Sequence, residues 1–119
     1  HNLSYKDAHM AILHWNDVEE RQLNDIIRGR IVKTDNVMAC RITAKAGNPI
    51  KTHTHEFDQI THMIRGKLKF HSGDGEHQVV QAGDVMIFPA GTPHGGEVLE
   101  DAEYIDMFSP PNPDFQWDK

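Results

Sequence analysis

The sequence has one cysteine, no long apolar run and fewer basic than acidic residues. Cys40 is the single cysteine, so no disulfide can form within the chain, and we expect a buried reduced thiol and a cytoplasmic location. No run reaches the roughly 18 apolar residues that a membrane-spanning helix needs, which argues against a membrane partner. With 12 Lys and Arg against 18 Asp and Glu, the formal charge of −6 repels a phosphate backbone and argues against nucleic acid as a partner.

The first residues do not show the order of basic, apolar and small residues that is typical of a secretion signal. We expect the start at His1, without Met, to be the trimmed end of an expression scar. A chain of 119 residues has room for one domain. We therefore predict a single domain over residues 1–119, with a barrel core at about 30–109, an N-terminal arm and a C-terminal Pro-rich tail.

Turn-forming residues interrupt the sequence at short intervals, as at Gly66, Gly73-Asp74-Gly75 and Gly95-Gly96. The pieces between these turns are rich in β-branched and aromatic residues, which predicts strands over 37–43, 59–65, 67–71, 77–81, 85–88 and 103–108. Many short strands at close spacing indicate an all-β sandwich or barrel. Only residues 16–27 have helical character, for one or two turns at most, with Asp17 as the expected cap.

Four residues form a candidate metal site. His53 and His55 are two residues apart in a predicted strand, which places both imidazoles on one face, and Gln59 shares their parity. His94 follows the stiff segment 89–93, which contains two prolines. Three imidazoles and one oxygen suit a divalent transition metal such as Zn, Ni, Mn or Fe better than Ca or Mg. The alternative is that these are ordinary surface histidines in a chain that has nine.

The spacing of these residues resembles the two motifs of the cupin superfamily. The matching residues are Gly47, His53, His55, Gln59 and Gly66, followed by Gly83, Pro89, Gly91 and His94. This resemblance implies a cupin jelly-roll barrel, or double-stranded β-helix, with one bound metal. Such barrels host many chemistries, so the fold alone does not specify an activity.

Two positions depart from the cupin motifs. Gln59 stands where the first motif has Glu, and Val98 where the second has Asn. Because the amide oxygen of Gln59 is neutral, a divalent metal bound to it keeps its full charge and attracts an anionic substrate. In the alternative interpretation, Gln59 hydrogen-bonds a bound water and only the histidines contact the metal.

A larger set of residues resembles the KdgF family of small cupins. The resemblance includes Trp15, Arg28-Gly29, both motifs, Asp101 and the closing segment from Asp106 to Phe115. Members of that family convert 4,5-unsaturated monouronates, released from pectin or alginate, to linear keto-deoxyuronates. The resemblance therefore implies a metal-dependent ring-opening enzyme with a small anionic substrate. Small cupins commonly pair through sheet edges and terminal strands, so we also expect a homodimer.

The resemblance also assigns roles to individual residues. In the KdgF family the positions of Asp106 and Phe108 line the site, which implies that Asp106 moves a proton and Phe108 contacts the substrate. Alternatively, Asp106 is a structural carboxylate and Phe108 a core residue. The family has Arg where this chain has Asn112, so Arg41 is the candidate substitute that, with Gln59, would bind the substrate. An Arg on a strand is at least as often a solvated residue of the outer face.

Two other functions are compatible with the sequence. A cupin with three histidines and a redox metal would be a dioxygenase or lyase acting on another small acidic substrate. A non-catalytic, metal-containing cupin would bind a sugar without turnover.

Overall fold

The computed structural model describes residues 10–72 and 75–115. In these ranges the chain forms eight antiparallel strands, and its only helical piece is the single 3-10 turn η1 (Trp15–Asp17). The strands are β1 (Arg21–Gln22), β2 (Ile27–Lys33), β3 (Met38–Ala44), β4 (Pro49–His53), β5 (Asp58–Ser72), β6 (His77–Gln81), β7 (Val85–Phe88) and β8 (His94–Ser109). The predicted all-β class is confirmed. None of the described helical structure is long and apolar enough to span a membrane.

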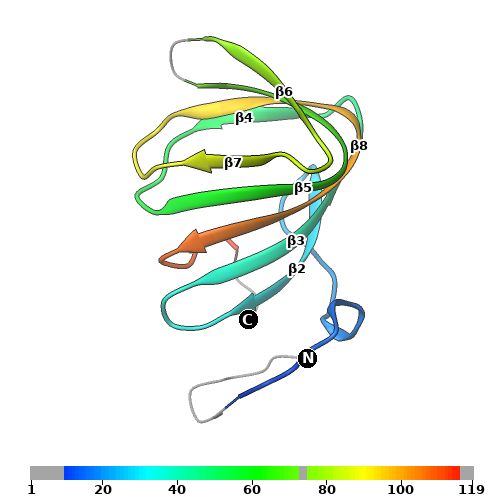
Figure 1. The fold of residues 1–119 in the computed structure, drawn as a ribbon, viewed down its shortest axis with the longest axis vertical. Coiled ribbons are helices and arrows are strands. Elements are labelled where there is room, and N and C mark those ends of the chain that lie inside the picture. Colours follow the sequence, from blue (N-terminus) through cyan, green and yellow to red (C-terminus); the bar gives the residue numbers. More distant parts are fainter. Residues whose placement is uncertain (1–9, 73–74, 116–119) are drawn as a thin grey trace.

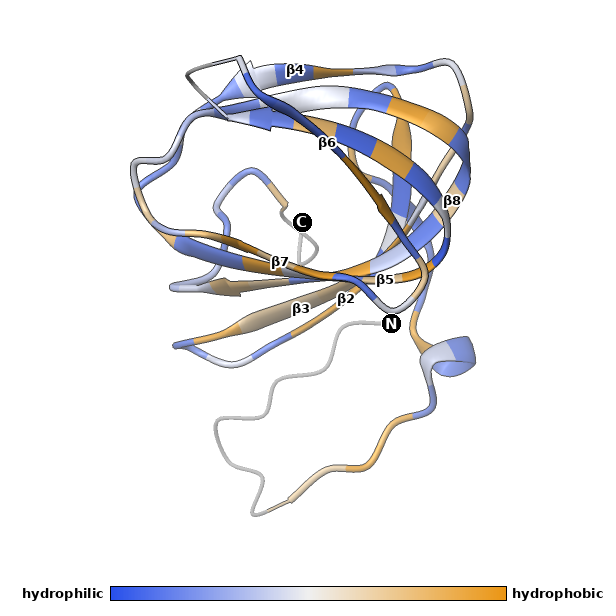
Figure 2. Cartoon of the chain, turned by 45° about the horizontal axis from the view of Figure 1, so that its top comes forward, coloured by the Kyte–Doolittle hydropathy of each residue, from blue (hydrophilic) through white to orange (hydrophobic). Residues whose placement is uncertain are grey.

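The two longest strands, β5 and β8, pair along almost their whole length and hold the rest of the sheet together (Figure 1). The second half of β8 also pairs with β3, and its first half pairs with β4. In the same way, β7 pairs with the first half of β5 and β6 with the second half. Because both long strands bend sharply, the sheet curls around a common interior (Figure 2).

Gly66 lies at the bend of β5. Its φ of +82° is in the region that L side chains rarely adopt, and a Cβ atom there would lie 2.2 Å from the carbonyl oxygen of Asp101 on β8. The pairing register is irregular between Met63 and Leu68, as expected for a local bulge. The prediction of two strands, 59–65 and 67–71, was therefore wrong at this point: one strand runs through the glycine and changes direction there.

Gly95 and Gly96 also lie inside a strand instead of forming the predicted turn. A Cβ atom on Gly96 would lie only 1.7 Å from the carbonyl oxygen of Lys69, so Gly96 allows β8 to approach β5 closely, and a Cβ atom on Gly95 would lie 2.8 Å from the backbone of Thr52 on β4. The predicted turn at Gly73-Asp74-Gly75 includes two residues, 73 and 74, that lie outside the described residues. The strands on either side of it pair antiparallel as far as His71 and His77.

The predicted helical stretch is mostly extended chain. η1 is capped by His14, whose Nδ1 atom accepts a hydrogen bond from the backbone of Asn16, and not by Asp17. Further along, the side chain of Asn24 accepts hydrogen bonds from the backbone amides of Ile26 and Ile27 and turns the chain into β2. A side chain that binds local amides in this way favours a turn over a helix.

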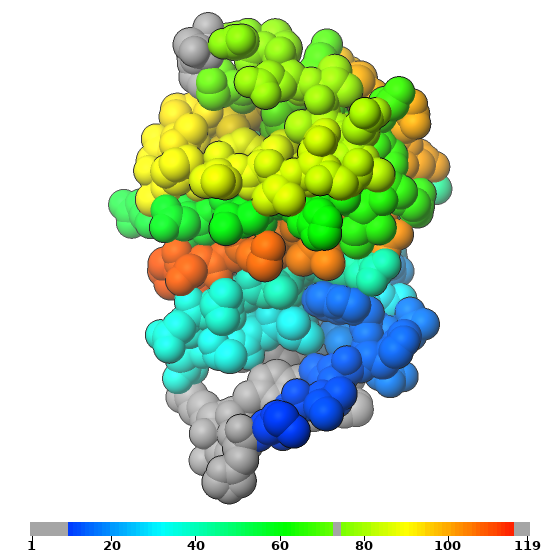
Figure 3. All heavy atoms as spheres, in the orientation of Figure 1, coloured from blue at the N-terminus to red at the C-terminus, as the bar shows by residue number. Residues whose placement is uncertain are grey.

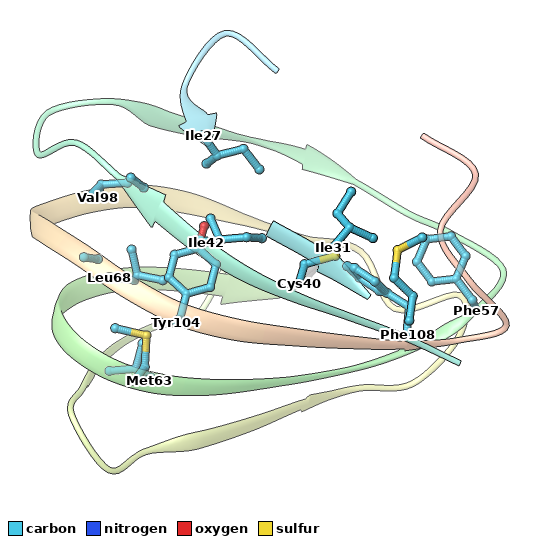
Figure 4. Packing of buried hydrophobic residues seen from close by; sticks show 14 residues of the cluster. Ile27, Ile31, Cys40, Ile42, Phe57, Met63, Leu68, Val98, Tyr104 and Phe108 are labelled. Atoms are coloured by element: carbon cyan, nitrogen blue, oxygen red, sulfur yellow. The ribbon is translucent and has the colours of Figure 1, made fainter. Parts of the chain in front are cut away.

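The core follows the alternation of the strands. On β3, for example, Met38, Cys40 and Ile42 are buried, whereas Ala39 and Arg41 between them are partly exposed. Figure 4 shows the buried side chains filling the interior from Leu68 and Val98 at one end to Phe57 and Phe108 at the other. The buried polar residues are Gln59, Thr61, His94, Asp106 and Asn112.

We expect Gly66→Ala to lower the free energy of unfolding by at least ~3 kcal/mol, because the new methyl group overlaps the β8 backbone and the positive φ becomes strained. Gly83→Ala is the matched control, since Gly83 has a similar φ but open space at its Cβ position. It is expected to cost only ~1–2 kcal/mol. Urea denaturation measures both values, and equal losses would contradict the steric argument.

Candidate functional site

Three histidines from separate parts of the chain meet at one end of the barrel. His53 is the last residue of β4 and pairs directly with His94, the first residue of β8. His55 lies beyond the end of β4, in the loop before β5, and not within a strand as predicted. Its carbonyl oxygen accepts a 2.8 Å hydrogen bond from the amide of Gly91, which ties this loop to the segment before His94. Nitrogen atoms of the three rings all lie within 4.8 Å of one another.

Each of these rings is oriented by a backbone carbonyl. The Nδ1 atoms of His53, His55 and His94 lie 2.8, 3.0 and 3.0 Å from the carbonyl oxygens of Lys51, Phe57 and Thr92. A carbonyl oxygen can only accept, so each Nδ1 atom donates and carries the proton. In the neutral ring the Nε2 atom then keeps a free lone pair. This is the arrangement by which metal-binding histidines are usually held.

The Nε2 atom of His94 gives the clearest indication of a cation site. It is the one buried side-chain nitrogen or oxygen of the described residues that has no hydrogen-bond partner, and the residue is only 1% exposed. Burial, together with the nearby His53 and His55, lowers the pKa of His94 to about 4, although the carbonyl of Thr92 raises it. The ring is therefore neutral near pH 7, and its lone pair is suited to a metal cation.

Gln59 completes this group. Its Oε1 atom lies 3.0 Å from the Nε2 atom of His55, and its amide nitrogen donates to Thr61 Oγ1 at 2.9 Å and to Asp106 Oδ1 at 3.4 Å. These hydrogen bonds turn the amide oxygen toward the histidines. Two ligand atoms at ~2.0–2.1 Å from one tetrahedral zinc ion lie about 3.3 Å apart, so the observed separation suits a shared ion. The four side chains thus fit a divalent metal.

Asp106 lies directly behind Gln59. It pairs across the sheet with Thr61 on β5 and Cys40 on β3, and the Thr61 hydroxyl donates to its Oδ1 atom at 2.6 Å. Burial raises the pKa of Asp106 to about 7, even though the hydrogen bonds from Thr61 and Gln59 lower it. No lysine or arginine in the described part of the chain forms an ion pair with this carboxyl group.

Thr61 is a residue that the sequence analysis missed. Its single hydroxyl accepts from Gln59 and donates to Asp106, so it links the two predicted site residues. The signal was its position: it is two residues after Gln59 and therefore on the same strand face. What the sequence could not show is that β8 places Asp106 opposite it.

Aromatic rings form the wall around the histidines. Phe57 stacks on His55 with ring centroids 3.9 Å apart, and Phe88 stacks on His94 at 4.3 Å. Phe108 is buried behind Phe57 and contacts it edge-on at 5.2 Å. Phe108 is thus a core residue beside the site, and its contact with a substrate stays a prediction. His53 is exposed, so the site opens to solvent on its side.

Arg41 does not join this group, and its expected role in substrate binding was wrong. It lies between the inward-facing Cys40 and Ile42 on β3, so its side chain is on the outer face. There it forms an ion pair with Glu103, which also binds Arg65 at 3.1 Å. Burial would raise the pKa of Glu103, but its hydrogen bonds to the two arginines lower it overall. Arg41 is therefore part of a surface network.

Asn112, which stands where the KdgF family has Arg, has a local structural role. It is buried, its side-chain oxygen accepts from the amide of Asp114 at 2.9 Å, and its carbonyl accepts from the amide of Phe115 at 3.2 Å. This turn brings the ring of Phe115 against Phe108 at 5.7 Å. Asn112 therefore positions Phe115 against Phe108 and supplies no positive charge.

A family model described as "Cupin domain" matches residues 40–108, which include all four candidate ligands and Asp106. The chain belongs to the cupin family. The predicted jelly-roll cupin fold is confirmed by the solved structures that it resembles. An RmlC-like cupin from Shewanella frigidimarina is 24% identical with a TM-score of 0.79, over 91% of this chain and 96% of that one.

KdgF from Halomonas sp. is 30% identical to this cupin, with a TM-score of 0.76, over 85% of this chain and 94% of that one. The polyketide cyclase RemF from Streptomyces resistomycificus shares the fold at 17% identity and a TM-score of 0.74, over 87% of this chain and 82% of that one. A nitrosourea synthase from Streptomyces achromogenes is 31% identical over 55 residues. This match spans 46% of the cupin chain but only 12% of that protein. The names of the last two relatives describe enzymes with different reactions.

We expect Thr61→Val to lower the free energy of unfolding by ~1–3 kcal/mol, because it leaves Asp106 and the Gln59 amide with one partner fewer inside the protein. In an Asp106→Ala background the same change should cost at least ~1 kcal/mol less, since the carboxylate is gone. Thr43→Val, on the outer side of β3, is the control and should cost little. Denaturation of the four proteins of this cycle measures the coupling, and strictly additive losses would disprove it.

Proposed function

We propose that this cupin is a metal-dependent enzyme that opens the ring of 4,5-unsaturated monouronates and produces linear keto-deoxyuronates. The observation that carries the proposal is the Gln59 amide. Its oxygen faces the three histidines and its nitrogen contacts Asp106, so one side chain joins the candidate metal centre to the candidate proton-transfer group. The likeness to KdgF over most of both chains supports the same substrate class.

In this proposal His53, His55, His94 and Gln59 hold one divalent transition metal. With three neutral imidazoles and a neutral amide as ligands, such an ion keeps its charge and supplies electrostatic attraction for an anionic substrate. This matters because the residues at the site provide little other positive charge: Arg41 faces outward and Asn112 is neutral. Because the Gln59 amide is neutral, it leaves the full charge of the metal available to attract the substrate.

The chemistry requires one proton to leave an oxygen and one to reach a carbon. The anomeric hydroxyl loses its proton as the bond from the anomeric carbon to the ring oxygen breaks and an aldehyde forms, and the ring oxygen takes up a proton to become the hydroxyl of an enol. The released enol then becomes a ketone by taking a proton on the neighbouring carbon and losing one from oxygen, so substrate and product are isomers. Asp106 is the group proposed to move these protons, because its buried carboxyl is balanced between its two forms near pH 7.

The surroundings of the site favour a small substrate. Phe57, Phe88 and Phe108 limit the space around the histidines and exclude water from the inner side, whereas the exposed His53 leaves one side open. The proposal retains a cytoplasmic location, which suits the buried free thiol of Cys40, and a homodimeric assembly.

We expect the purified protein to bind one divalent metal per chain and His94→Ala to weaken that binding at least ~100-fold, because His94 supplies the buried ligand atom. His62→Ala is the matched control, since His62 is exposed on the outer side of β5 and should leave affinity unchanged. Elemental analysis and titration calorimetry with zinc or nickel measure this. Equal affinities for the two variants would remove the metal from the proposal.

We expect the metal-loaded protein to abolish the absorbance of the conjugated double bond in unsaturated galacturonate or mannuronate. Asp106→Asn should reduce turnover by ~10²-fold or more while metal content is retained, since the amide cannot transfer the proton. No absorbance change with either sugar would exclude ring opening. Turnover that stops when oxygen is removed would instead favour the dioxygenase alternative.

A further inference from the structure

Two histidines outside the barrel site lie directly opposite each other on neighbouring strands. His71 on β5 and His77 on β6 are pairing partners. Phe70 packs against the core and Val80 is buried, so the alternation of side chains places both histidines on the outer face of the sheet. Figure 3 shows the β5–β6 hairpin at the surface, at the opposite end of the molecule from the blue N-terminal arm.

The two rings have the spacing of imidazoles that share a metal ion. Their centroids are 5.2 Å apart. Two imidazoles on one tetrahedral ion, each with a nitrogen ~2.0–2.1 Å from the metal, have ring centroids about 5 Å apart. Inside the barrel the centroid distance is 5.1 Å for His55 and His94 and 5.5 Å for His53 and His55. The outer pair therefore has the same spacing as the candidate ligands of the barrel site.

The ring of His71 is held only by long polar contacts. Its Nε2 atom lies 3.5 Å from Thr52 Oγ1, and its Nδ1 atom lies 3.4 Å from the carbonyl oxygen of Ser72. Both distances are at the weak end of hydrogen bonding. The ring can therefore turn to share an ion with His77, and the Thr52 hydroxyl lies where it can bind a water molecule on that ion.

Gly95 leaves space beside this histidine pair. It is the partner of His71 on β8, the strand on the side of β5 that is away from β6. A Cβ atom on Gly95 would lie 2.8 Å from Thr52 Oγ1. Because glycine has no side chain, the surface between Thr52 and His71 stays open. An ion with only two protein ligands needs such room for the water molecules that complete its coordination.

We propose that His71 and His77 bind a second divalent transition metal ion, separate from the barrel site. Imidazole nitrogens suit Zn, Cu and Ni. Ser72, the residue after His71, is the pairing partner of His94, so the two ions lie on opposite faces of the same part of the sheet. Lys69, two residues before His71 on the outer face, forms an ion pair with Glu97 at 3.2 Å, which offsets its repulsion of a cation.

The outer site binds its ion more weakly than the barrel site does. It offers two imidazoles at the surface, whereas the barrel offers three imidazoles and an amide oxygen around the buried His94. Each additional ligand held in place by the fold strengthens metal binding. The purified protein therefore retains the one ion of the barrel site, and the outer site fills only when more metal is added.

The test is a calorimetric titration of the full-length His94→Ala variant with zinc, up to about 1 mM. This variant lacks the buried ligand of the barrel site and should still bind zinc at the outer pair. Adding either His71→Ala or His77→Ala should remove that binding, because one imidazole does not chelate. Zinc should also raise the Tm of His94→Ala, and this shift should disappear in the same two double variants.

His62→Ala in the same background is the matched control. His62 is also on the outer face of β5, but its pairing partners are Val85 and Ile105, which carry no imidazole, so zinc binding should be unchanged. Absence of zinc binding by His94→Ala overturns the proposal, as does binding that either double variant retains. These outcomes do not depend on the barrel site or on turnover, because the wild type tests those separately. Circular dichroism checks that each variant folds.

Discussion

Neutral imidazole nitrogens that face one another with free lone pairs need a proton or a cation between them. In this cupin three backbone carbonyls hold the protons on the far side of the rings, so the Nε2 atoms of His53, His55 and His94 face each other as acceptors. The amide oxygen of Gln59 adds a fourth acceptor. This electrostatic arrangement is the constraint on which the interpretation of the site depends, and a divalent cation satisfies it.

The barrel provides this arrangement through its two long strands. β8 carries His94 at its start and Asp106 near its end, and β5 carries Gln59 and Thr61. Because both strands bend and pair along their length, they place the ligands and the buried carboxyl at the same end of the barrel. Gly66 and Gly96 make the close approach possible. The bend of the sheet therefore determines where the candidate ligands on β5 and β8 and the carboxyl group of Asp106 lie.

The inward and outward faces of the same strands have different structural roles. The inward residues of β3, β5 and β8 build the core and the site, whereas the outward ones include the exposed Ile60 and Met107 and the arginines that pair with Glu103. Since side chains alternate strictly along a strand, a shift of one residue exchanges these tasks. This explains why Arg41, one residue from the buried Cys40, belongs to the surface and not to the site.

The sequence by itself determined the all-β class, the cupin spacing and the set of four candidate ligands, because period-two alternation, turn residues and histidine spacing are local patterns. Several strands were also correct, with 77–81 and 85–88 matching β6 and β7. Only the tertiary structure decided that Gly66 bends one strand, that Thr61 joins Gln59 to Asp106, and that Asn112 closes a turn. The link from Gln59 and Thr61 to Asp106 depends on which residues the sheet brings opposite one another, and it joins positions more than forty residues apart in the chain.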